Sequence, residues 1–94
     1  MPAYVIVEID IHDPELYEEY KKLTPESISD FGGKFVIRGN PVKVLEGEWN
    51  HDRFVMLEFK DKVTAENWYY SEKYTKARKI RLKASKANFF VIES

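Results

Sequence analysis

The sequence contains no cysteine, and this absence excludes every function that depends on a thiol. The fold cannot rest on disulfides, and the chain can form neither a thiolate zinc site nor a cysteine nucleophile. Histidine is also scarce, since only His12 and His51 are present and they share no helical or strand spacing. We therefore expect no dedicated metal site, no heme ligand and no other cofactor.

An excess of charge of one sign is also missing. Fifteen Lys and Arg residues stand against 16 Asp and Glu residues, which gives a formal net charge of −1. This balance argues against nucleic acid or an anionic membrane as a partner. The segment from Lys73 to Lys86 is locally basic, and we interpret it as a solvated helix face rather than a nucleic-acid surface.

Long apolar runs and nucleotide or nucleophile motifs are absent as well. No segment resembles a signal peptide or a membrane span, so a cytoplasmic location is expected. No glycine-rich loop joins a strand to a helix, and no serine lies in a nucleophile elbow.

What the chain does have is a high content of aromatic residues in a short length. Hydrophobic residues make up 44% of its 94 residues and aromatic residues 15%, which indicates an ordered globular protein. The length predicts a single domain over residues 1–94. A domain this small leaves much of its surface exposed, so oligomerisation is expected.

Alternating apolar residues predict the strands. Val5, Val7 and Ile9 share one parity within 3–11, and the same alternation recurs from Arg53 to Lys60 and from Ala87 to Glu93. Lys34 to Arg38 is predicted as another strand. We expect Val42 to Glu46 to continue it beyond a turn at 39–41.

Capping residues predict the helices. Asp13 before Pro14 indicates a helix start, and we expect a kink or break at Pro25 and a stop at Gly32 and Gly33. Asp61 is predicted to cap a second helix and Ser71 its continuation.

The resulting order, βαββαβ, predicts an α+β, ferredoxin-like fold in which an antiparallel sheet carries the helices on one face. We expect the first and third strands to be central neighbours and to run parallel. The other face would expose Ile6 and Met56, so we predict a homodimer that packs sheet against sheet.

Several short motifs in order resemble the bacterial domain of unknown function family numbered 1330. These motifs are Gly32-Gly33-Lys34-Phe35, Arg38-Gly39, Leu45-Glu46-Gly47-Glu48-Trp49, Arg53, Leu57-Glu58-Phe59, Ala65, Trp68-Tyr69, Ser71 and Tyr74. The resemblance implies the dimeric α/β barrel, a superfamily that includes heme-degrading and cofactor-free monooxygenases and muconolactone isomerase. The family itself has no agreed activity, so the resemblance predicts fold rather than function.

A set of polar and aromatic residues is predicted to bind a ligand. Aromatic walls with a guanidinium suit a small carboxylate or an enol-like molecule. Packing is the competing interpretation, in which Trp68 and Tyr74 belong to the core and Trp49 seals the dimer. The candidate residues are Glu8, Arg38, Trp49, Arg53, Glu58, Trp68, Tyr74 and Arg81.

Glu8 and Glu58 form a separate hypothesis. Both follow an apolar residue at the same spacing, as Ile6-x-Glu8 and Met56-x-Glu58, so both are predicted on the helix-free face. Buried together, they would need Arg38 or Arg53 as a counter-charge, or one of them would have a raised pKa. The alternative is that they lie near strand ends and reach water.

Two functional interpretations stay open. The first is a small homodimeric barrel that binds a small organic acid or similar metabolite, with cofactor-independent isomerase or monooxygenase-like chemistry. The second is a non-catalytic ligand-binding or structural dimer module. The sequence leaves open whether the chain is an enzyme.

Overall fold

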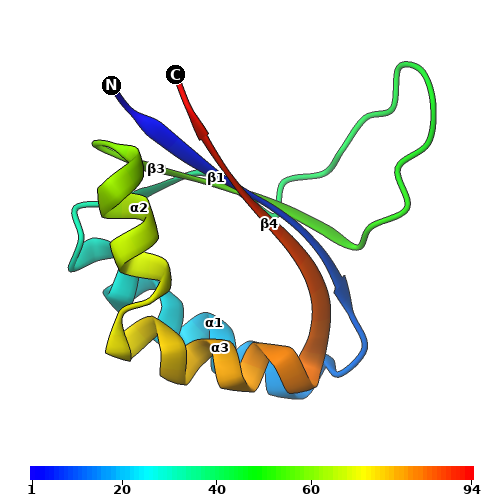
Figure 1. Cartoon of the computed structure of the whole chain (residues 1–94). Coiled ribbons are helices and arrows are strands. Elements are labelled where there is room, and N and C mark those ends of the chain that lie inside the picture. Colours follow the sequence, from blue (N-terminus) through cyan, green and yellow to red (C-terminus); the bar gives the residue numbers. More distant parts are fainter.

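The computed structural model describes all of residues 1–94, and its backbone forms one sheet with the helices on one face (Figure 1). The elements follow in the order β1 Ala3–Ile11, α1 Pro14–Ser29, β2 Lys34–Arg38, β3 Arg53–Phe59, α2 Lys62–Tyr69, α3 Glu72–Ala84 and β4 Ser85–Glu93. This confirms the α+β, ferredoxin-like prediction.

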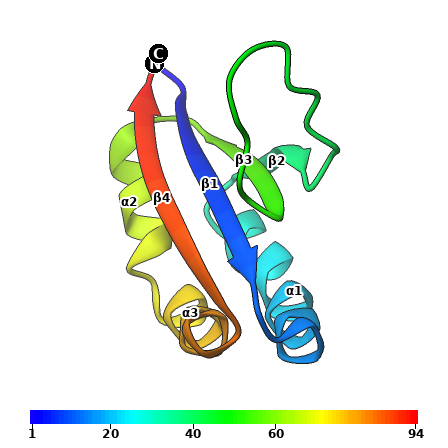
Figure 2. The same ribbon diagram turned by 90° about the vertical axis from the view of Figure 1, so that its right-hand side faces the viewer.

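The sheet is antiparallel throughout, with strand order β2-β3-β1-β4. The prediction that the first and third strands run parallel is wrong, because β1 pairs with β3 in antiparallel register. Helix α1 returns the chain so that β1 and β2 point the same way, and the reversal into β3 then opposes both. Figure 2 shows β1 and β4 side by side, with α2 behind β4 and with α1 and α3 below the strands.

Alternation along the strands separates a buried face from a helix-free face. Val5, Val7 and Ile9 of β1 are each about 2% exposed, and they lie beneath the helices with Leu57 and Phe59 of β3. The opposite parity is less covered. Phe90 and Ile92 remain 51% and 52% exposed on the helix-free face.

Side chains cap all three helices as predicted. The Asp13 carboxylate accepts from the Leu16 N–H, Asp61 from Thr64, and Ser71 from Tyr74. Each cap satisfies a backbone donor that the first helical turn leaves unpaired. Gly32 follows α1 at φ +69°, a conformation that only glycine adopts without strain.

Of the kink or break expected just before Pro25, the break is wrong, since α1 continues through the proline to Ser29. The buried stripe runs on both sides of the proline, from Tyr20 and Thr24 to Ser27 and Ile28, and its packing offsets the missing N–H donor.

The expected strand from Val42 to Glu46 is also wrong, since these residues form part of a long loop between β2 and β3. Val42, Val44 and Leu45 are 45%, 44% and 92% exposed, so no neighbouring strand or core holds them extended. In Figure 1 this loop projects from the side of the sheet away from the helices.

No helix in the structure has both the length and the apolar character that crossing a membrane requires.

Candidate functional site

Aromatic side chains fill the space between the helices and the sheet. Trp68 lies 4.2 Å from Tyr74 and 5.4 Å from Phe59 between ring centroids, and Tyr69 lies 5.6 Å from Phe89. Such tilted and edge contacts are favourable beyond the area they bury. The cluster therefore provides a rigid aromatic wall rather than a loose core.

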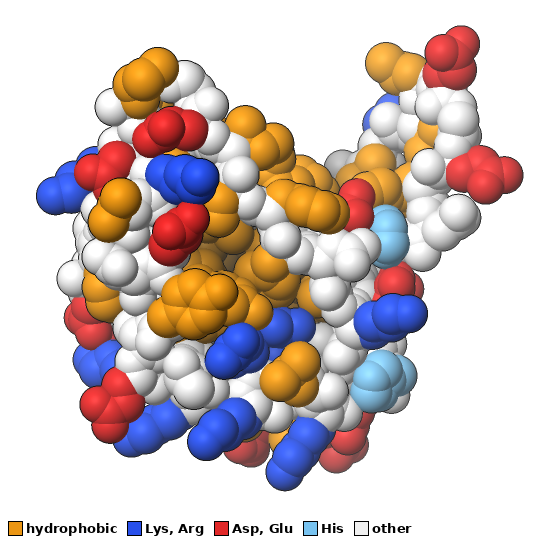
Figure 3. Space-filling model, in the orientation of Figure 1, with side chains coloured by type: hydrophobic (Ala, Val, Ile, Leu, Met, Phe, Trp, Pro, Cys, Tyr) orange, Lys and Arg blue, Asp and Glu red, His pale blue; other side chains and the backbone are white.

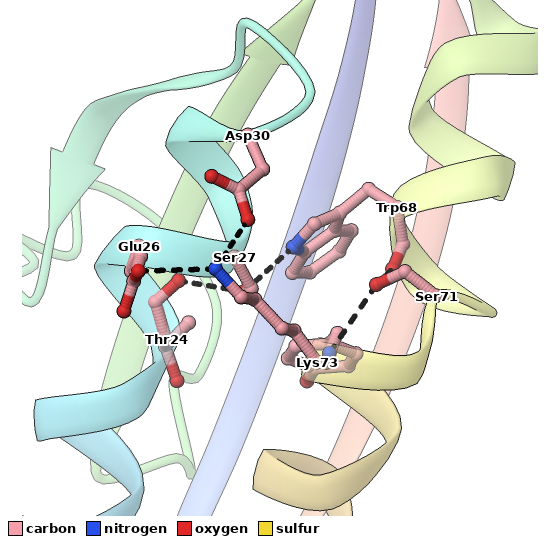
Figure 4. Close-up of polar contacts among 8 residues, drawn as sticks. Thr24, Glu26, Ser27, Asp30, Trp68, Ser71 and Lys73 are labelled. Carbon is pink, nitrogen blue, oxygen red and sulfur yellow. Dashed lines mark hydrogen bonds and ion pairs between the residues drawn. The ribbon is translucent and has the colours of Figure 1, made fainter.

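Polar contacts anchor Trp68 within this wall (Figure 4). Its indole N–H donates to the Ser27 hydroxyl at 3.1 Å, and Ser27 donates to the Thr24 carbonyl at 2.7 Å. On the outside, the Lys73 ammonium pairs with Glu26 at 3.0 Å and with Asp30 at 2.8 Å. These contacts fix α2 and α3 against the second half of α1.

Three tyrosines of the cluster keep their protons at neutral pH. The Tyr20 and Tyr74 hydroxyls share a hydrogen bond of 2.8 Å in the interior. Burial raises the pKa of Tyr17, Tyr20 and Tyr74 above the ordinary value, and nearby Arg81 only partly offsets it. These phenols are therefore neutral hydrogen-bonding groups and not bases.

All four arginines of the chain stack on aromatic rings and lack a carboxylate partner. The guanidinium carbons lie 4.3 to 5.9 Å from the ring centroids of Phe35, Tyr17, Tyr69 and Phe89, for Arg38, Arg53, Arg78 and Arg81 respectively. Lysines and His51 instead make all of the ion pairs. The four guanidinium groups thus have no counter-charge within the chain, which suits them to bind an anion.

An apolar groove of about 450 Å³ opens between α2 and the β4 edge of the sheet. In Figure 3 it appears as a hollow with hydrophobic side chains inside and Lys and Arg side chains along its lower rim. Its volume lies in the range of small-molecule sites. Its lining comprises Val5, Ala65, Trp68, Tyr69, Phe89 and Val91, with Glu66 and Tyr70 also contributing.

Two arginines from α3 flank this groove. Arg78 donates to the Tyr69 hydroxyl at 3.2 Å and lies over the same ring. Arg81 lies over Phe89, is only 3% exposed, and has a buried Nε without a hydrogen-bond partner. A buried cation without a counter-charge is costly, and an anion beside it would remove that cost.

A second opening, the cationic hollow, lies on the other side of the cluster. It measures about 400 Å³ and is lined by Glu18, Lys21, Lys22, Arg38 and Arg53. A narrow pocket lies between Arg38 and Arg53 on one side and Trp68 and Phe89 on the other. Its volume is about 30 Å³, far smaller than that of the apolar groove or the cationic hollow.

The structure divides the predicted site residues between the two faces of the sheet. Trp68, Tyr74 and Arg81 meet at the aromatic cluster, and Arg38 and Arg53 line the cationic hollow. Trp49 lies on the other face, 5.9 Å from Phe54. The helix-free face also carries Glu8 and Glu58, as the strand register requires.

The predicted pairing of Glu8 with Glu58 is wrong. Glu8 lies opposite Phe54 and Glu58 opposite Tyr4, so four residues of strand, roughly 13 Å, separate the two carboxylates. Neither has an arginine partner, because Arg38 and Arg53 belong to the helix-covered face. Glu8 instead contacts His51 and Asn88, and Glu58 contacts Lys34.

Three residues of the site were missed by sequence reasoning. Tyr17 lies one turn before Tyr20, and Arg78 one turn before Arg81, so helical spacing was the available signal. Phe89 has the parity of Val91, which places both beneath the helices. The contact of Phe89 with Arg81 depends on how α3 packs against β4, which spacing within each element does not contain.

These features define a ferredoxin-like α+β protein with an aromatic interior and two openings bordered by arginines. The chain belongs to the family described as Domain of unknown function (DUF1330), whose model matches residues 2–94. No curated protein matches it.

Solved structures share the fold at low sequence identity. A protein of unknown function from Rhodopseudomonas palustris is 18% identical with a TM-score of 0.76, over 99% of this chain and 82% of that one. A dimeric ferredoxin-like protein of unknown function from Jannaschia sp. is 13% identical with a TM-score of 0.78, over 100% of both chains. SnoaB, a cofactor-independent oxygenase from Streptomyces nogalater, is 12% identical with a TM-score of 0.67, over 99% of this chain and 92% of that one.

Proposed function

We propose that the protein binds a small organic acid with a flat apolar body in the apolar groove. The ring or chain of the ligand lies against Trp68 and Phe89, and its carboxylate points toward Arg78 and Arg81. The observation that carries this proposal is the pair of arginines beside an apolar groove, both without a carboxylate partner.

Burial and charge together favour an acid over a neutral ligand. Arg81 is only 3% exposed. An anion near its guanidinium would be attracted more strongly than in water, because the local dielectric constant is low. Glu66 is exposed, so its charge is screened by water and opposes an anion only weakly.

The tyrosines favour binding over base catalysis by the protein. A general base needs a pKa near the working pH, whereas burial moves those of Tyr17, Tyr20 and Tyr74 away from it. None of the three lines the apolar groove, and the Tyr20 and Tyr74 hydroxyls bond to each other. We therefore place a non-catalytic binding role first.

Cofactor-independent isomerisation or oxygenation is the second candidate. The fold neighbour SnoaB is an oxygenase of this kind, and free guanidiniums would stabilise the oxygen of an enolate. The ligand would have to ionise without a protein base. Oxygen uptake or double-bond migration with an enolisable ligand would support this role.

We also propose that two copies associate through the helix-free face. Met56, Ile6 and Phe90 form a row across three strands of that face, and Phe90 is half exposed in one copy. Apolar rows of this kind are normally covered in proteins of this size. The Jannaschia neighbour, described as dimeric, has the same fold.

Calorimetric titration with 3-phenylpropanoate and with its neutral amide tests the binding proposal. We expect the acid to bind at least tenfold more tightly, since a charge-assisted hydrogen bond is worth about 1.5–3 kcal/mol. Arg78→Gln should abolish this preference, and Lys79→Gln, an exposed change on the same helix, should preserve it. Equal affinity for acid and amide would refute the proposal.

A further inference from the structure

We propose that the cationic hollow is a second site, which binds a compact phosphate-bearing anion such as a phosphate ester or a diphosphate. This site is separate from the apolar groove, and the inference does not depend on what the groove binds. It rests on the charges of the hollow and on the way in which Arg53 is held.

The cationic hollow has more positively charged side chains than nearby carboxylates to neutralise them. Four cationic side chains and one carboxylate line it, which leaves a local net charge of +3 in a protein whose formal net charge is −1. Glu18, the carboxylate, is already paired with Lys21 at 2.9 Å. The remaining cations, Lys22, Arg38 and Arg53, have no acidic partner.

Arg53 is held in place by the backbone and by an aromatic ring. Gly39 has φ +71°, and a Cβ at this position would collide with the Arg53 guanidinium, 2.7 Å from its Cζ. The opposite contact is the Tyr17 ring, 5.9 Å from the same carbon. The Nε of Arg53 is buried without a hydrogen-bond partner. A fork fixed in this way loses little side-chain entropy when it binds an anion.

Arg38 places a second guanidinium at the same hollow. It stacks on Phe35 at 4.3 Å and lies opposite Val55, two residues from Arg53 along the paired strands. The two guanidinium groups and two ammonium groups of the hollow have more hydrogen-bond donors than the single carboxylate of Glu18 can accept. A tetrahedral phosphate has enough oxygens and charge to use several of them.

The geometry separates this site from the apolar groove. The hollow has no hydrophobic lining, so it does not suit an apolar acid. No residue lines both the hollow and the apolar groove. Ligands at the two sites are therefore different molecules, and each can bind while the other is present.

Titration of the full chain with pyrophosphate, followed by calorimetry and by backbone amide shifts, tests the proposal. We expect saturable binding with the largest shifts at Arg38, Gly39 and Arg53, unchanged when 3-phenylpropanoate is present. Arg38→Gln and Lys22→Gln, both at exposed side chains, should each weaken binding about tenfold. Lys34→Gln removes the same charge from β2 on the opposite face and should have no effect.

The outcomes distinguish this site from the groove and from charge alone. Pyrophosphate binding without any effect of Arg38→Gln would overturn the assignment of the site. Citrate binding as tightly as pyrophosphate would overturn the phosphate class. Loss of the preference for 3-phenylpropanoate over its amide in Arg78→Gln, with pyrophosphate binding intact, would support two independent sites. Displacement of pyrophosphate by 3-phenylpropanoate would overturn their separation.

Discussion

Tyr17, Tyr20 and Tyr74 place three phenols in the interior, and their burial makes the protein sensitive to alkali. Their folded-state pKa values lie above the ordinary value of 10.0. Below about pH 10 both states hold these protons, so stability does not depend on them. Above it the unfolded chain ionises first, and the free energy of unfolding falls as pH rises, by about 1.4 kcal/mol per pH unit for each phenol.

We predict that Tyr17→Phe removes about a third of the tyrosine contribution to this alkaline slope. Denaturant unfolding between pH 8 and 11.5 measures it. Tyr70→Phe is the matched control, because Tyr70 is 73% exposed and the same hydroxyl is removed from the surface. A slope that Tyr17→Phe leaves unchanged would contradict the assigned burial.

Gly39 links backbone conformation to the position of Arg53. Gly39→Ala should destabilise the fold by about 1–2 kcal/mol from its positive φ, and further because the new methyl displaces the guanidinium. Gly47→Ala separates the two effects, since Gly47 has φ +89° with no atom near the added Cβ. The denaturation midpoint should fall more for Gly39→Ala than for Gly47→Ala. Equal decreases in the two variants would contradict the claim that Gly39 holds the Arg53 guanidinium in place.

Among individual residues, sequence reasoning found those whose type alone marks them. Arg38, Arg53, Trp68, Tyr74 and Arg81 all border the aromatic interior or its openings. The sequence did not predict which residues pair across strands. The distance between Glu8 and Glu58 depends on the antiparallel register of β1 and β3, and the spacing of residues within one strand does not determine that register.

Ser71 connects two helices and shows how local signals determine elements. Its hydroxyl accepts from the Tyr74 N–H at 3.2 Å and donates to the Trp68 carbonyl at 2.7 Å, so it begins α3 and satisfies the end of α2. We predict that Ser71→Ala lowers the free energy of unfolding by about 1 kcal/mol. Chemical denaturation checks this against Ser29→Ala, an exposed change at the end of α1, which should cost less. A neutral Ser71→Ala would show that packing alone orients the two helices.

Elements were predicted well where the signal is local and poorly where it depends on neighbours. Caps at Asp13, Asp61 and Ser71 require only a few adjacent residues, and all three are present. The strand expected from Val42 to Glu46 needs a pairing partner that one copy does not provide. The break expected at Pro25 ignored the packing that holds α1 on both sides of it.

The whole molecule carries helices on one face of its sheet and an apolar row on the other. We predict a dimer at micromolar concentration and a monomer for Phe90→Lys, because the new ammonium would be buried in the proposed interface. Phe90 is half exposed in one copy, so the change should leave the fold intact. Light scattering measures the mass, and circular dichroism verifies folding.

Leu82→Lys is the matched control for this interface. Leu82 is 61% exposed on α3, and α3 lies on the other side of the sheet from the proposed contact. The Leu82→Lys variant should therefore remain dimeric. A native protein that is monomeric, or a Phe90→Lys variant that stays dimeric, would show that the helix-free face is not the interface.

The central claim is that the apolar groove binds an organic acid through its arginines, and the fluorescence of Trp68 tests it most directly. Trp68 lines the groove and the other tryptophan, Trp49, lies on the opposite face, so Trp49→Phe leaves a single reporter at the site. We predict a saturable change in Trp68 emission with 3-phenylpropanoate, at least tenfold weaker binding of the amide, and loss of this preference in Arg78→Gln. Unchanged Trp68 emission, or equal binding of acid and amide, would contradict the claim.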